Sequence, residues 1–231
     1  MGCRRRLISG MDRVFEVVEE AILLEDDCLP DASFFRFCEE MLERYRDNPQ
    51  IGFVAGFNPL ERDLKYASSY CFSNMACLWG WATWRRAWRE YDEHLTTWPE
   101  VKAQGLLRRQ FPQRRSLNYW TGVFDRMYAG TGPNTWDYQW EYTCWMHEWL
   151  AVVPAYNLVQ NIGAGEQATH TRTMNSGLML AAGEMEFPLR HPAAIAPLAG
   201  YPTRLQNRFF SPPLAVRMVR RLKNWLNERR G

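Results

Sequence analysis

Hydrophobic residues near the start of the chain recur at a spacing of three and four positions, as Leu7, Met11, Val14, Phe15 and Val18. This spacing predicts one amphipathic helix that ends near residues 19–20. The next four residues, 21–24, are all apolar, which is typical of a strand covered on both faces. The predicted strand stops at three consecutive carboxylates, residues 25–27.

A second helix and a second strand follow the carboxylates. Residues 31–48 carry apolar side chains on one helical face, with Asp31 or Ser33 as a possible N-cap and Pro49 as the stop. Residues 51–57 predict another buried strand. Strand, helix and strand in this order favour an α/β fold with a mostly parallel sheet and flanking helices.

The rest of the chain is richer in aromatic residues. Four tryptophans fall within residues 79–88, helical patterns cover 100–128 and 136–149, and a late strand is expected within 151–162. Repeated prolines after residue 187 indicate an extended segment. We expect one domain over residues 1–190, followed over 191–231 by this extended segment and a basic amphipathic helix.

Composition narrows the class of protein. Apolar residues make up 46% of the 231 residues, which is enough for a sizeable core, and the net charge of +2 argues against nucleic-acid binding. The six cysteines form no C-x-x-C pair, and the chain has neither a signal segment nor an 18-residue apolar run. We therefore expect free thiols and a cytoplasmic location, with pairing of Cys71 and Cys77 as the alternative for a secreted protein.

The C-terminal helix expected from this pattern has an apolar stripe opposite six basic residues, within positions 215–230. Such a helix fits peripheral contact with an anionic membrane, here the inner face of the cytoplasmic membrane. An ordinary amphipathic helix packed on the domain is the equal alternative.

The acidic triplet Glu25, Asp26 and Asp27 is the first candidate for chemistry. Adjacent like charges raise one another's pKa unless a positive group lies among them, and a divalent ion would resolve this conflict. Carboxylate oxygens suit Mg²⁺ or Mn²⁺, and ligands of α/β sheets collect at the carboxyl ends of strands. The alternative is a solvated acidic turn in which Asp27 or Asp31 caps the next helix.

Four stretches resemble those of bacterial nucleotide-diphospho-sugar transferases, in the same order. These enzymes have the GT-A fold and are similar to glycosyltransferase family two and to N-acetylglucosaminyltransferase I. The stretches are ILLEDDCLP (22–30), LWGWATWRRAW (78–88), TWDYQW (135–140) and NLVQNIGAGEQATHT (157–171). The resemblance covers roughly residues 1–190 and implies an inverting, metal-dependent glycosyltransferase that moves a sugar from a nucleotide-diphospho-sugar to a hydroxyl acceptor.

The resemblance also implies residue roles. Asp27 would ligate the metal that bridges the donor diphosphate, while Glu25 and Asp26 would contact the donor or tune the metal. Asp137 would act as the base for the acceptor hydroxyl, because flanking aromatic residues desolvate it. Its alternative role is to cap the helix that follows, and Asp125 and Glu141 are the reserve candidates for the base.

The remaining candidates lie in three segments. His170 would add a ligand for the metal or a phosphate, and Glu166 lies in the same glycine-containing loop, although both could equally be plain loop residues. Aromatic faces can stack on sugar rings, so the acceptor cleft is expected near Gly80. Its candidate lining residues are Trp79, Trp81 and Trp136, and the alternative is that most of the tryptophans are core residues.

The triplet comes at position 25, whereas the family places strand–helix units that bind the nucleoside before it. We therefore expect a GT-A-like domain without these N-terminal strands, which a longer gene product or another chain would supply. Two other functions remain open: a non-catalytic remnant or glycan-binding module, and a metal-dependent phosphohydrolase that uses the same carboxylates.

Overall fold

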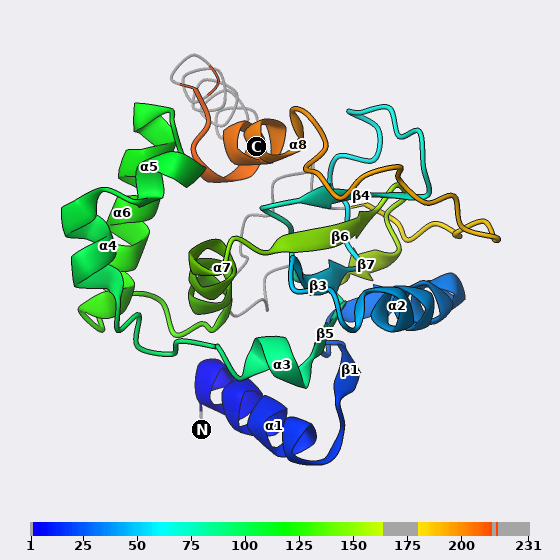
Figure 1. The fold of residues 1–231 in the computed structure, drawn as a ribbon, viewed down its shortest axis with the longest axis horizontal. Helices are drawn as coiled ribbons and strands as arrows, with labels where there is room; N and C mark the ends of the chain where they lie inside the picture. Colours follow the sequence, from blue (N-terminus) through cyan, green and yellow to red (C-terminus); the bar gives the residue numbers. More distant parts are fainter. Residues whose placement is uncertain (1, 164–179, 214–215, 217–231) are drawn as a thin grey trace, which may run out of the picture.

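The computed structural model describes residues 2–163, 180–213 and 216. The chain forms an α/β fold with a five-stranded mixed sheet and flanking helices (Figure 1). The elements are α1 (Cys3–Val17), β1 (Glu20–Leu23), β2 (Cys28–Pro30), α2 (Ala32–Tyr45), β3 (Ile51–Ala55), β4 (Tyr70–Ser73), β5 (Trp81–Trp84), α3 (Arg85–Trp88), α4 (Trp98–Gln104), α5 (Leu107–Gln110), α6 (Arg114–Tyr128), α7 (Asp137–Met146), β6 (Leu150–Pro154), β7 (Val159–Asn161), α8 (Tyr201–Leu205) and the π-helical turn η2 (Gln206–Phe210).

The first three predicted elements are confirmed. Helix α1, strand β1 and helix α2 occupy the predicted ranges to within a few residues. Asp31 is the N-cap of α2, because its side chain accepts a hydrogen bond of 2.8 Å from the backbone N–H of Ser33. This bond satisfies one of the amide groups that a helix start leaves unpaired.

The expectation of a mostly parallel sheet is wrong. The strand order is β1-β5-β3-β6-β4, and among the described strands of this sheet only β3 and β6 pair in parallel. Strands β1 and β3 do run in the same direction, as the strand–helix–strand pattern requires. However, β5 is inserted between them and is antiparallel to both, so the two do not pair with each other.

Each face of the sheet packs against its own hydrophobic core. Along β3 the side chain of Val54 joins the core under α2, whereas Phe53 and Ala55 join the core on the opposite face. Strand residues alternate between faces, so α2 covers one face, while α1, α6 and α7 pack on the other (Figure 1). The core on the face covered by α1, α6 and α7 is dominated by tryptophan rings, including Trp81, Trp120 and Trp140.

The helical pattern over residues 100–128 is split into three helices, α4, α5 and α6. Gly105 ends α4 in a left-handed conformation with φ of 66°, which glycine adopts without steric cost. Pro112 lies between α5 and α6, where its ring and missing N–H prevent one helix from continuing. Periodicity alone does not detect these two interruptions.

The free thiols are confirmed for Cys28, Cys38, Cys71, Cys77 and Cys144. No helix in the described ranges is long and apolar enough to cross a membrane. The expected C-terminal amphipathic helix lies outside the described residues, apart from residue 216.

Candidate functional site

The acidic triplet forms the turn between β1 and β2. The backbone N–H of Cys28 donates to the carbonyl of Glu25 at 3.0 Å, and that of Ile162 donates to the carbonyl of Asp27 at 2.8 Å. The second bond continues the small antiparallel sheet of β2 and β7. The triplet is therefore held between two sheets, with the side chain of Asp26 exposed and those of Glu25 and Asp27 half-buried.

Two glycines allow the backbone to approach this turn closely. Gly80 has φ of 62°, and a Cβ there would lie 2.7 Å from Val159 Cγ2 and 3.2 Å from Leu24 Cδ2. A Cβ at Gly163 would collide with the carboxylate of Asp27. Gly80 and the described residues 159–163, which come from two of the resembling stretches, thus lie beside the β1–β2 turn.

Asp137 lies close enough to the triplet for their charges to interact. It is the first residue of α7, and its carboxylate accepts a hydrogen bond of 2.5 Å from the hydroxyl of Thr135. Burial and, to a lesser degree, the charges of Asp27, Asp137 and Asp26 together raise the pKa of Glu25 to about 7. Glu25 and Asp137 therefore belong to one acidic cluster, although they are 112 positions apart in the sequence.

Glu141 extends this cluster into the core. It lies one helical turn after Asp137 on α7 and is only 7% exposed. Burial raises the pKa of its carboxyl well above the usual value, the charge of Asp137 adds to this effect, and a hydrogen bond from the backbone of Ala76 opposes it. Glu141 therefore lies behind Asp137, away from solvent.

Asp125, the other reserve candidate for the base, is engaged in an ion pair. Its carboxylate accepts hydrogen bonds from Trp98 Nε1 at 3.0 Å and from Lys102 Nζ at 2.7 Å. Burial is the largest single influence and raises its pKa, but the two hydrogen bonds and the charges of Lys102 and Arg126 together outweigh burial and hold the pKa below its usual value. A carboxylate stabilised in this way is a weak base.

Of the three candidate tryptophans, one is half-buried and two are core residues. Trp79 is half-buried and its ring packs against Phe57 at a centroid distance of 4.6 Å. Trp81 and Trp136 are 1% and 2% exposed and stack on each other at 5.2 Å, so both belong to the core rather than to a cleft surface. The alternative that most of these tryptophans are core residues holds for this pair.

His170 and Glu166 lie outside the described residues. Within the ranges that the structure does describe, no group of three or more His, Cys, Asp or Glu residues has a metal-binding arrangement. Mg²⁺ is commonly held by one or two carboxylates together with substrate phosphates rather than by an all-protein cage. The half-buried Asp27, beside an exposed Asp26, fits such a site.

Tyr91 belongs to this neighbourhood although no motif pointed to it. Its hydroxyl donates to the carbonyl of Trp136 at 3.1 Å, one residue before Asp137. Burial raises the pKa of this hydroxyl, the nearby Arg4 opposes that effect, and the charges of Glu93 and Asp137 contribute to it. The contact joins segments 45 positions apart, so no local pattern could have predicted it.

No model of a known protein family and no curated protein matches the chain significantly. The chemistry of the site therefore follows from its geometry.

Proposed function

We propose that this chain carries the metal-binding and acceptor-side part of a glycosyltransferase. The reaction would transfer a sugar from a nucleotide-diphospho-sugar to a hydroxyl group of a glycan or similar acceptor, with inversion at the anomeric carbon. The GT-A class of the fold is part of this proposal.

The observation that carries the proposal is the proximity of Asp137 to the triplet. Asp137 is near enough to Glu25 for its charge to raise the pKa of Glu25. An inverting displacement requires a base near the acceptor hydroxyl, on the opposite side of the reacting sugar from the leaving diphosphate. A metal-binding carboxylate and a second, partly desolvated carboxylate in one site satisfy that requirement.

Asp137 would accept the proton of the acceptor hydroxyl as the new glycosidic bond forms. The hydroxyl of Thr135 and the backbone N–H of Tyr138 both donate to Asp137 Oδ1, the latter at 2.9 Å, and these bonds fix the orientation of the carboxylate. Asp27 would hold Mg²⁺ or Mn²⁺, which when bound neutralises charge on the leaving diphosphate. Glu25 and Asp26 would complete the polar surroundings of the donor.

Metal and donor binding can be tested by calorimetry. Mn²⁺ and a panel of UDP-, GDP- and dTDP-sugars are titrated into the wild-type protein and into the Asp27→Asn variant. We expect donor binding only with Mn²⁺ present, and loss of both metal and donor binding in the variant. Unchanged binding of metal and donor by Asp27→Asn would contradict the proposal.

Asp137→Asn is the matched variant, because it also exchanges a carboxylate for an amide. It should keep the affinity for metal and donor and lose transfer. Release of inorganic phosphate from the donor or from simple phosphate esters would favour the phosphohydrolase. Glycan binding without any binding of donor or metal would favour the non-catalytic module.

A further inference from the structure

We propose that the cleft between α1 and the segment 85–93 is a second carbohydrate-binding site, which holds a neutral sugar unit of a glycan. The cleft has a volume of about 380 Å³ and opens to solvent. Clefts of a few hundred to a thousand cubic ångströms are typical of small-molecule sites.

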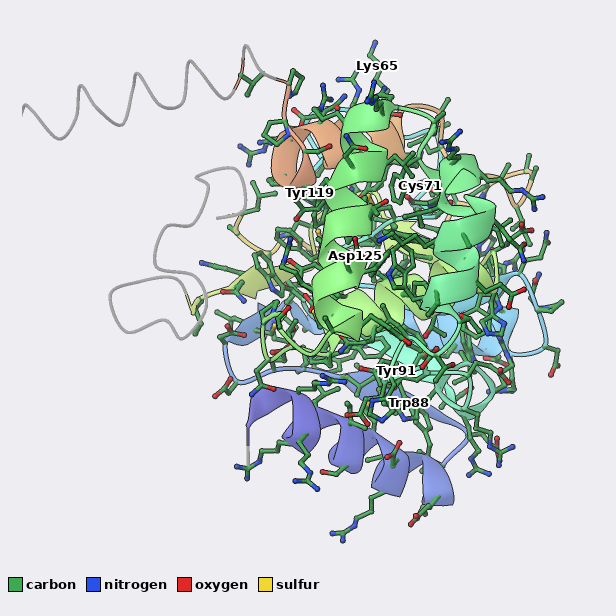
Figure 2. All side chains as sticks on the ribbon, turned by 90° about the vertical axis from the view of Figure 1, so that its left-hand side faces the viewer. Lys65, Cys71, Trp88, Tyr91, Tyr119 and Asp125 are labelled. Atoms are coloured by element: carbon green, nitrogen blue, oxygen red, sulfur yellow. The ribbon has the colours of Figure 1, made fainter. Side chains whose placement is uncertain are left out.

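Aromatic rings form part of the wall. Trp88 and Tyr91 both line the cleft and stack on each other at a centroid distance of 4.5 Å and an angle of 9°. In Figure 2 the two labelled residues lie beside α1, and Trp88 Nε1 donates to Asp12 Oδ1 of that helix at 2.8 Å. Trp88 is only 4% exposed, so the half-buried ring of Tyr91, on which Trp88 stacks, is the apolar surface against which the C–H face of a sugar ring can pack.

Polar groups of both signs surround these rings. Asp12 accepts a hydrogen bond from Trp88, Glu93 is paired with Arg4 at 3.4 Å, and Arg85 is paired with Glu19. The other oxygen of Asp12 and the exposed carboxylate of Glu16 can accept hydrogen bonds from a ligand, and the exposed guanidinium of Arg89 can donate them. Sugar hydroxyls do both. Because Glu93 and Arg85 are neutralised by their ion-pair partners and the remaining groups Asp12, Glu16 and Arg89 carry charges of both signs, this lining suits a neutral polyhydroxy ligand better than a phosphate or a cation.

The cleft also adjoins the helix end that carries Asp137. Tyr91 lines the cleft and donates through its hydroxyl to the carbonyl of Trp136. A glycan held on Tyr91 would therefore lie close to the start of α7. That the bound glycan is the acceptor rests on the proposed transferase function, whereas saccharide binding in the cleft does not.

The experiment is a saccharide titration of the full chain, followed through the indole N–H resonance of Trp88. Trisaccharides of glucose, mannose, galactose and N-acetylglucosamine are the probes, and the resonance is assigned with Trp88→Phe and, as a second route, with Asp12→Asn. We expect saturable shifts of this resonance with at least one probe. No shift with any probe up to about 10 mM would overturn the proposal.

A pair of exposed rim residues localises the effect. The double variant Glu16→Ala/Arg89→Ala removes one acceptor and one donor, and it should weaken binding about tenfold, as expected for lost hydrogen bonds to charged groups. The control variant Glu39→Ala/Arg13→Ala changes the same residue types outside the cleft and should bind as the wild type does. Equal affinity of the two double variants would also overturn the proposal.

Failure of this site and failure of the proposed function are distinguishable. Asp27→Asn should leave the Trp88 titration unchanged, because the metal ligand is not part of the cleft. Saccharide binding without any transfer would contradict only the transferase, and transfer without a Trp88 shift would contradict only the second site.

Discussion

The carboxyl of Glu25 has a pKa of about 7 because burial opposes its ionisation and Asp27 and Asp137 repel its charge. An acid whose pKa is higher in the folded state binds more protons when folded, between its usual pKa of 4.5 and about 7. The free energy of unfolding should therefore fall as the pH rises through this window. The loss is complete above the folded pKa.

Glu25→Gln should remove that dependence. In metal-free protein with EDTA, we expect the variant to be about 1–3 kcal/mol more stable than the wild type at pH 8 and equally stable at pH 4. Urea unfolding at both pH values measures the difference. A variant that is less stable than the wild type at pH 8 would show that the ionised Glu25 is stabilised in the fold.

Gly80 is required by its conformation as well as by its neighbours. With φ of 62° and Val159 Cγ2 2.7 Å from the position of a Cβ, Gly80→Ala should lower the free energy of unfolding by about 2–4 kcal/mol. Gly130→Ala is the matched control, because Gly130 has φ of 69° but no described atom within 4 Å of its Cβ position. Its cost should be only about 1 kcal/mol, and equal costs in denaturant titrations would contradict the steric argument.

At the scale of the element, the start of α2 depends on one side chain. Asp31→Ala removes the acceptor for the backbone N–H of Ser33, and we expect a loss of about 1 kcal/mol in the free energy of unfolding. Asp31→Asn keeps an acceptor oxygen and should cost only a fraction of this. Thermal unfolding monitored by circular dichroism compares the two, and a larger loss for Asn than for Ala would contradict the capping role.

Helices and strands with a single dominant period could be predicted from the sequence. Helix α2 has an apolar stripe, a cap and a stop within 20 residues, so its range follows from local pattern. Strand β5 could not be predicted, because its tryptophan-rich sequence gives no clear alternation and its position between β1 and β3 depends on distant pairings. This insertion is why the predicted sheet direction was wrong.

The candidate site was predictable in part for the same reason. The triplet follows directly from an apolar run that ends in three carboxylates, and the resemblance added Asp137. The contact of Tyr91 with Trp136 and the burial of Glu141 arise from packing between helices. No spacing along the chain encodes them.

At the scale of the whole molecule, the fold brings together segments that are far apart in sequence. The turn after β1, the glycine before β5, the start of α7 and the end of β7 meet beside Asp27 and Glu25. The β2–β7 sheet holds one side of this site, and the tryptophan core behind α7 holds the other. A rigid frame of this kind keeps two carboxylates near each other despite their repulsion.

The most direct test of the central claim is sugar transfer by the wild-type protein and by Asp137→Asn, measured by mass spectrometry of a glycan acceptor with saturating nucleotide-sugar and Mn²⁺. We expect the acceptor to gain one sugar unit with the wild type. With Asp137→Asn we expect a rate lower by about 10²–10⁴-fold at unchanged donor affinity, because a general base is lost. Transfer at the wild-type rate by Asp137→Asn, or a donor that binds without ever being transferred, would contradict the claim.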